Sequence, residues 1–440
     1  MTHGYKYSMS LTVIGDHEPR TIQQLQRCVQ AEEGAAGVLC ADGHVGYSQP
    51  VGGAVAYRSH ISVSGVGYDI GCGNKAARTD VRHEDIQQDL PRIMDAIVRR
   101  ISFGVGRHNN EPVDHPVLDA IRAANAPPQR ALLDLAAKQL GTVGAGNHYV
   151  DLFADEEGFV WVGVHFGSRG FGHKTASGYL ALAQGLPFDA RAGEGEMDAP
   201  PTLLPTGSEL GQEYIAAMSL AGDYAYAGRD IVVARVLDIL GAASTFEVHN
   251  HHNFAFKESH DGDEWWVVRK GCTPAFPGQQ GFVGSTMGET SVILEGVDTA
   301  AARAAFFSTV HGAGRRLSRT QAAGKMGVAF ECSVRDCEFF MTRSEHRAAK
   351  HPACPRHPDA RLLKRRRRIR PGLIDFGAVR EELRRRGIEL RGGAADEAPD
   401  AYKRLDDVLA EHGDSIRVLH RLTPIGVAMA GPDIYDPYKD

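Results

Sequence analysis

Apolar residues recur at every third or fourth position in several segments of the chain, which is the spacing of one helix face. Between Ile86 and Ile101, for example, isoleucine or leucine recurs at steps of three or four. Asp298 and Thr299 precede an alanine-rich member of this group, at the place where a helix cap is expected. The spacing predicts helices over residues 84–102, 115–140, 209–241, 298–309 and 376–386.

Two glycine-dense segments follow a different pattern. Residues 37–80 and 141–175 contain short β-branched runs, such as those from Ala54 to Tyr57 and from Phe159 to Val164. Runs of this kind between glycines predict strands joined by tight loops. The chain shows no internal repeat and no low-complexity linker, so we expect one α+β domain over residues 1–440.

Residues 331–371 differ from their surroundings and predict an insertion within this domain. They hold three of the seven cysteines, several histidines and a basic run from Lys364 to Arg368. Cysteines and histidines at short spacings are typical of structural zinc sites. Here the ligands of such a site would be Cys332, Cys337, Cys354 and His357. The alternative is a surface insertion with free cysteines, and the basic run is either an RNA contact or a solvated face.

The composition is that of a water-soluble globular protein, since 42% of the 440 residues are hydrophobic and 24% are charged. The net charge is −6, so any RNA site must be a local basic patch. The N-terminus has no apolar run long enough for a signal peptide or a membrane span, and the odd number of cysteines does not suggest a disulfide framework. We expect a cytoplasmic protein, monomeric and without a membrane partner, whose cysteines are free to bind metal.

Two glycine-rich loops carry the first candidate chemistry. Residues 67–73 read Gly-Tyr-Asp-Ile-Gly-Cys-Gly, and the glycines allow Asp69 and Cys72 to converge on one ligand. The alternative is a tight turn beside a cysteine that is only a small core residue. The second loop ends on Asn147 and His148, and such loops can hold phosphate through backbone N–H groups.

Further histidines follow along the chain. His165 ends an apolar run four residues before Arg169, which suits a metal ligand beside an anion-binding guanidinium, although a lone core histidine is the default. His249, His251 and His252 are crowded together, and because neighbours on a strand alternate faces, one or two of them can share a site.

The donors together suffice for two metal ions if the Cys72 sulfur bridges them. Zinc would outcompete manganese by affinity alone, so metal availability and site geometry must decide. Another histidine, His311, is followed by glycines and by Arg315, and arginines near glycine loops indicate phosphate chemistry. The residues alone therefore predict a metal-dependent phosphoryl-transfer enzyme.

At these same positions the sequence resembles the RtcB family of RNA-splicing ligases. The matching blocks occur in family order over most of the chain. Each block alone is modest evidence for the family, but the ordered set is specific. They are residues 42–47, 67–73, 144–148, 165–170, 252–253, 269–271, 287–291, 311–315 and 397–403. The resemblance implies an RtcB-like fold of central β-sheets wrapped by helices.

The resemblance also implies a role for each matching residue. His311 would be the nucleophile that takes guanylate from GTP, with Arg169 and Lys270 facing RNA or nucleotide phosphates. Two Mn²⁺ ions would be held by Asp69, Cys72, His148, His165 and His252. The guanine nucleotide would be held by Asn147, Asp151, Ser291, Arg315 and Tyr402.

The implied activity is ligation of RNA in repair or tRNA splicing. RNA ends with a 3′-phosphate or 2′,3′-cyclic phosphate would be joined to 5′-hydroxyl ends through a guanylyl-histidine intermediate. Two departures concern the nucleotide pocket. Asp151 stands where the family usually has glutamate, and residues 426–431 lack the terminal lysine-glycine that contacts the nucleotide. Either Lys439, in the nine residues that follow, or another group substitutes for this lysine, or the interaction with the nucleotide is weakened.

Two other functions are compatible with these departures. A diverged metal-dependent phosphohydrolase or phosphodiesterase, acting on RNA or nucleotide ends, would keep the metal ligands and need no guanine pocket. An RNA-end binder without catalysis would need neither His311 nor the complete ligand set, both of which are present. The identity of the RNA does not follow from the sequence.

Overall fold

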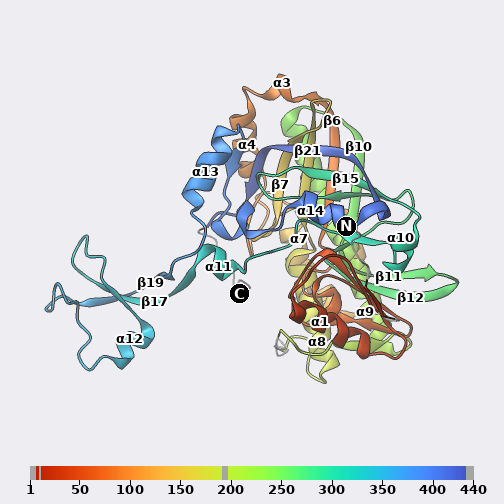
Figure 1. The fold of residues 1–440 in the computed structure, drawn as a ribbon, viewed down its shortest axis with the longest axis horizontal. Coiled ribbons are helices and arrows are strands. Elements are labelled where there is room, and N and C mark those ends of the chain that lie inside the picture. Colours follow the sequence, from red (N-terminus) through yellow and green to blue (C-terminus); the bar gives the residue numbers. More distant parts are fainter. Residues whose placement is uncertain (1–5, 9–10, 191–196, 433–440) are drawn as a thin grey trace.

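Glycine-bounded β-branched runs and amphipathic segments produce a mixed α+β fold with two large sheets, which confirms the predicted class (Figure 1). The computed structural model describes residues 6–8, 11–190 and 197–432. The six-stranded sheet has the order β1 (Lys6–Ser8), β2 (Leu11–Val13), β3 (Ala36–His44), β4 (Val51–Tyr57), β12 (Asp263–Lys270) and β11 (Asn253–His260).

The second large sheet contains the strand predicted from Phe159 to Val164. Its order is β10 (Ser244–His251), β6 (Gly73–Arg82), β8 (Phe159–Phe166), β7 (Tyr149–Ala154), β21 (Ile416–Met429), β15 (Ser291–Gly296) and β14 (Gln280–Val283), with β20 (Glu389–Arg391) paired to β21. Strand β10 ends at His251 and β11 begins at Asn253, so His252 lies where the chain passes from one large sheet to the other.

The longest predicted helix is confirmed as α9 (Glu209–Leu240), which lies against β6 and β8. Its ends follow from the sequence. The Ser208 hydroxyl accepts from the backbone N–H of Gly211, and Gly241 ends the helix in the left-handed conformation with φ 64°. Helix α13 (Phe376–Arg385) also agrees with its predicted range.

Three other predicted helices are shorter than their apolar spacing indicates. Residues 84–102 form two helices, α3 (His83–Ile86) and α4 (Leu90–Arg100), because Pro91 lacks a donor and starts a new helix. Residues 115–140 form three helices, α5 (Pro116–Arg122), α6 (Pro127–Ala131) and α7 (Leu133–Gln139), and proline starts the first two of them. Thr299 caps α10 (Ala300–Ala304) as expected, but the rest of 298–309 leads into strand β16 (Ser308–Val310).

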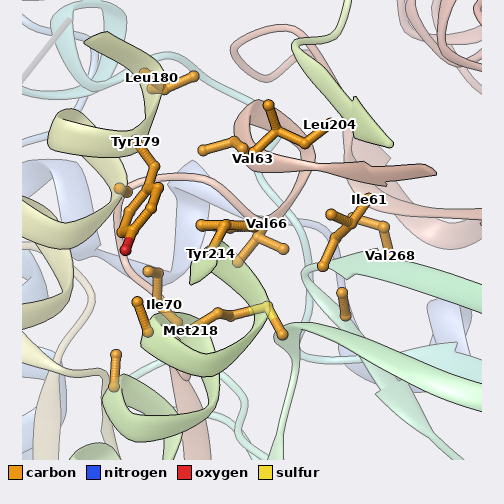
Figure 2. Packing of buried hydrophobic residues seen from close by; sticks show 14 of the residues in the cluster. Ile61, Val63, Val66, Ile70, Tyr179, Leu180, Leu204, Tyr214, Met218 and Val268 are labelled. Atoms are coloured by element: carbon orange, nitrogen blue, oxygen red, sulfur yellow. The ribbon is translucent and has the colours of Figure 1, made fainter. Parts of the chain in front are cut away.

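One hydrophobic cluster supports the first glycine loop (Figure 2). Ile70, within that loop, is fully buried, and so are Val63 and Val66 of the short helix α2 (Val63–Val66). They pack with Tyr179 of α8 (Arg169–Ala183) and with residues of α9. The loop that carries Asp69 and Cys72 is therefore anchored on an apolar core.

A small sheet stands away from the rest of the chain (Figure 1). It contains β17 (Lys325–Cys332), β18 (Phe340–Thr342) and β19 (Leu362–Arg370), with α12 (Arg343–Ala348) beside β18. We call residues 325–370 the small-sheet module. Its position accords with the predicted insertion, which remains a prediction. Within the described part of the chain, no helix is long and apolar enough to cross a membrane.

Candidate metal and nucleotide site

An open cavity of about 420 Å³ brings together residues from both large sheets. All five predicted metal ligands line it, as do the predicted nucleophile His311 and the predicted phosphate contact Lys270. Of the residues predicted to hold the nucleotide, those lining the cavity are Asn147, Asp151, Arg315 and Tyr402.

The thiol of Cys72 lies at the centre of two trios of donor atoms. In the first trio, Cys72 Sγ is 3.3 Å from His165 Nε2, which is 3.2 Å from His252 Nε2. In the second trio, Cys72 Sγ is 3.6 Å from His148 Nε2, which is 3.1 Å from Asp69 Oδ2. The two trios share only Cys72, so the donor set fits two cations bridged by a thiolate.

Local backbone structure brings these donors together. Cys72 directly precedes β6, and its carbonyl accepts from the backbone N–H of His252 at 2.8 Å. His165 is on β8, opposite Tyr149 of β7, and His148 directly precedes β7. A Cβ at Gly167 would lie 2.2 Å from Asp69 Oδ1, so only glycine leaves room for this carboxylate.

Hydrogen bonds and burial prepare the imidazoles to bind metal. The Asn147 carbonyl lies 2.9 Å from His165 Nδ1, and a carbonyl only accepts, so Nδ1 carries the proton and Nε2 faces Cys72. Burial holds the pKa values of His165 and His252 well below the ordinary range, so both rings are neutral at pH 7. Burial alone would raise the pKa of Asp69, but the hydrogen bond from His148 lowers it to about 2.

His311 lies beside this cluster, and its ring centroid is 4.9 Å from that of His252. Its Nδ1 is 2.7 Å from Asp42 Oδ2, and its backbone N–H donates to the same oxygen at 3.0 Å. The carboxylate fixes the proton on Nδ1, which leaves Nε2 with a free lone pair. Burial favours a protonated Asp42, but the charge and hydrogen bonds of His311 lower its pKa below the ordinary value.

Glycine makes room for the His311 ring. A Cβ built at Gly271 would lie 3.0 Å from His311 Cε1 and 2.5 Å from a methyl carbon of Val51. Gly271 also has φ 60°, a conformation that side chains disfavour. The Arg-Lys-Gly block that ends β12 therefore shapes the pocket through its glycine.

A network of arginines and acids forms another wall of the cavity. Arg315 donates to the Tyr402 hydroxyl at 2.7 Å, and its guanidinium carbon lies 4.8 Å from the centre of the Tyr402 ring. The Tyr402 hydroxyl donates to Glu397, which also pairs with Arg319. Glu397 and Arg319 line the cavity and were not assigned a role from sequence, although Glu397 begins the last block that matches the family.

Three predicted contacts have other partners in this structure. The Ser291 hydroxyl is buried and accepts from the backbone N–H of Ser285, whose loop lines the cavity. Arg169 donates to the carbonyl of Gly104 at 2.8 Å. Lys270 Nζ lies at the cavity and donates to the Tyr47 carbonyl at 2.7 Å. Their predicted roles toward nucleotide and phosphate remain predictions.

The two departures from the family pattern both concern the cavity wall. Asp151, on β7, lines the cavity, and burial raises the pKa of its carboxyl well above the ordinary value. Met429 at the end of β21 lines the cavity, and Ala430 follows it as a buried residue. Lys439 lies outside the described residues.

Arg229 on α9 was missed by sequence reasoning because it resembles an ordinary helix-surface arginine. Its side chain is fully buried and donates to the carbonyls of Gly71, at 2.8 Å, and Phe166, at 2.6 Å. It also contacts His249 and His251 at 2.8 and 3.0 Å, so these two histidines are partners of Arg229. The buried Arg229 therefore links the backbone beside Cys72 to the backbone beside His165 through hydrogen bonds.

Comparison with known proteins places this chain in a family. The family model described as tRNA-splicing ligase RtcB matches residues 24–127 and 118–349. The chain belongs to the RtcB family. It is 28% identical over 417 residues to the RNA-splicing ligase RtcB of Escherichia coli strain K12, covering 87% of each chain.

Archaeal members of the family show a comparable likeness. The chain is 28% identical to the tRNA-splicing ligase RtcB of Thermococcus kodakarensis and 29% identical to that of Pyrobaculum aerophilum. In both cases the alignment covers 89% of this chain and 87% of the relative.

Proposed function

We propose that this protein is a GTP- and Mn²⁺-dependent RNA ligase that acts through a guanylyl-histidine. Membership of a family named for RNA ligation supports the reaction class. The observation that carries the proposal is the position of His311, held by Asp42 and beside the donor cluster around Cys72. A non-catalytic RNA binder would need no such arrangement.

In the first step, His311 Nε2 attacks the α-phosphorus of GTP. An N–P bond forms, the bond to the bridging oxygen breaks, and pyrophosphate leaves. Asp42 accepts the hydrogen bond from Nδ1–H throughout, without taking the proton, and stabilises the positive charge that develops on the ring. Asp69, Cys72, His148, His165 and His252 would hold Mn²⁺, which supplies positive charge to the phosphate oxygens.

In the next steps, an oxygen of the RNA 3′-phosphate takes the guanylate from His311, and the RNA 5′-hydroxyl then attacks the activated phosphorus. A new phosphodiester forms and GMP leaves. A 2′,3′-cyclic phosphate would first be opened by water. Arg315 and Tyr402 would bind the nucleotide, and Lys270 would bind phosphate, since all three line the cavity. Repair of broken RNA or tRNA splicing is the cellular role we propose.

Self-guanylylation tests this proposal directly. The protein is incubated with Mn²⁺ and α-labelled GTP and separated on a denaturing gel, beside His311→Ala. His420→Ala is the matched control, because His420 is a partly exposed histidine that pairs with Glu156 on another part of the fold. We expect label on the wild type and the control and none on His311→Ala.

A phosphohydrolase acting on RNA or nucleotide ends is the second candidate, and one observation favours it. The chain has Ala430 in the place where lysine contacts the nucleotide in the family pattern, and Ala430 is buried without a charge. Absence of label at saturating GTP, together with release of phosphate from RNA ends, would replace the ligase proposal with this one.

A further inference from the structure

A second group of metal-binding side chains lies in the small-sheet module, apart from the cavity. Cys332 ends β17, Cys337 is in the loop before β18, and Cys354 and His357 are in the loop between α12 and β19. Three separate segments thus bring four ligand atoms within 4.8 Å of one another. None of these cysteines forms a disulfide.

The distances between these atoms match a tetrahedral metal site. Cys332 Sγ is 3.5 Å from His357 Nδ1, Cys354 Sγ is 3.7 Å from His357 Nδ1, and Cys337 Sγ is 3.7 Å from Cys354 Sγ. With Zn–S near ~2.3 Å and Zn–N near ~2.0 Å, neighbouring ligand atoms of a tetrahedron lie about 3.5–3.8 Å apart. A disulfide would instead require about 2.05 Å between sulfurs.

The module has almost no apolar core, which is an independent reason to expect a metal. Among residues 325–370, the buried side chains are those of Ala329, Cys332 and Cys354. Helix α12 and strand β19 bury no residue. Units this small without a core are usually stabilised by disulfides or metal ions, and two of the three buried residues here belong to the cluster.

We propose that Cys332, Cys337, Cys354 and His357 bind a structural Zn²⁺ ion that stabilises the small-sheet module. Thiolate and imidazole ligands select zinc over the harder cations magnesium and calcium. Four protein ligands complete the tetrahedron and leave no position for a substrate, so the ion has a structural role. It ties the end of β17 to the loop before β19 and so fixes the pairing of Cys332 with Leu362.

The metal content of the full chain tests this proposal. Metal bound in the cavity must be distinguished from metal bound in the small-sheet module. Cys72→Ala removes the ligand that both cavity trios share, so it serves as the background for every variant. In this background we expect one zinc per chain by mass spectrometry. Cys337→Ser and Cys354→Ser should lose it. His351→Ala should keep it, because His351 is an exposed histidine of the same module outside the cluster.

Limited proteolysis of the otherwise unaltered chain provides the second measurement. Removal of zinc by a strong chelator should make residues 325–370 sensitive to protease while the two large sheets resist, and added Zn²⁺ should restore protection. Cobalt substitution of the Cys72→Ala protein should give the visible absorption of a tetrahedral thiolate site. Absence of zinc from the Cys72→Ala protein, or its retention in Cys337→Ser, would overturn the proposal. Neither result bears on self-guanylylation.

Discussion

One carboxylate oxygen of Asp42 accepts both the backbone N–H of His311, at 3.0 Å, and the Nδ1–H of its ring, at 2.7 Å. Asp42 is on β3 of the six-stranded sheet, and His311 follows β16. The contact with Asp42 therefore sets the position and the tautomer of the proposed nucleophile.

Replacing Asp42 should slow self-guanylylation more than it affects GTP binding. We expect Asp42→Ala to reduce the rate about 100-fold or more, because the ring loses its orientation and its countercharge. Asp42→Asn keeps a hydrogen-bond acceptor without the charge, so its rate of self-guanylylation should lie between those of Asp42→Ala and the wild type. Rates of label incorporation at saturating GTP, with circular dichroism to verify folding, measure the effect. A wild-type rate in Asp42→Ala would contradict the assignment.

Arg229 should control metal affinity although it touches no metal. Its loss would free the carbonyls beside Cys72 and His165, and removal of such outer partners typically weakens metal binding about 10–100-fold. Titration calorimetry with Mn²⁺ compares Arg229→Met with Arg235→Met. Arg235 is the matched control, since it lies on the same helix and donates to Gly141 instead. Equal Mn²⁺ affinities in the two variants would refute the role of Arg229.

Phosphate binding should weaken as the pH rises through the pKa of Lys270. Burial lowers this pKa to about 8, so the ammonium is charged below pH 8 and neutral above it. RNA or GTP affinity should therefore fall between pH 7 and pH 9, measured by fluorescence anisotropy. Lys270→Arg stays charged over this range and should abolish this part of the pH dependence. If Lys270→Arg shows the same dependence of affinity on pH as the wild type, another group causes the loss of affinity.

A lysine restored at position 430 should improve use of GTP. Ala430 follows Met429, which lines the cavity, so a lysine there adds positive charge beside the proposed nucleotide site. We expect Ala430→Lys to raise self-guanylylation at low GTP and to leave the rate at saturating GTP little changed. Ala430→Met adds similar bulk without charge and is the control. No gain over Ala430→Met would count against a pocket weakened by the missing lysine.

The exposed arginines of β19 should add to the salt dependence of RNA binding. Arg365, Arg366 and Arg368 are exposed on the strand that stands away from the large sheets. If each contacts one phosphate, changing all three to glutamine should reduce the slope of log affinity against log salt by about 2, at about 0.7 per contact. The control changes Arg380, Arg384 and Arg385 of α13, which are equally exposed. If the β19 variant and the wild type have equal salt slopes, the basic run is a solvated surface that does not contact RNA.

The sequence predicts a structural feature well when the residues that determine it are close together along the chain, and poorly when they are far apart. Helix α9 was predicted within a residue because its caps are adjacent in sequence, whereas the break before α4 depends on Pro91, which the apolar spacing does not register. The residues of the two donor trios around Cys72 were named from their type and their glycine context, and their role as metal ligands stays a prediction. Asp42 received no role because its partner His311 is 269 positions away.

The alternation of side chains between the two faces of a strand led to a prediction about His249, His251 and His252. It indicated that only one or two of three crowded histidines can share a site, and the structure brings His252 to Cys72 while His251 faces Arg229. The sequence could not choose between them, because the choice depends on where β10 ends. Arg229 itself was undetectable, since burial of a helical arginine depends on the whole surrounding fold.

The position of His252 between β10 and β11 has a consequence for the order of assembly. His252 directly follows β10, and its backbone N–H donates to the carbonyl of Cys72, so the pairing of β10 with β6 places this donor in the same sheet as His165. A cation that needs His252 therefore binds only after β10 has paired with β6. By mass action the cation must then stabilise that pairing, so it would hold β10, the last of these strands along the chain, against the rest of its sheet.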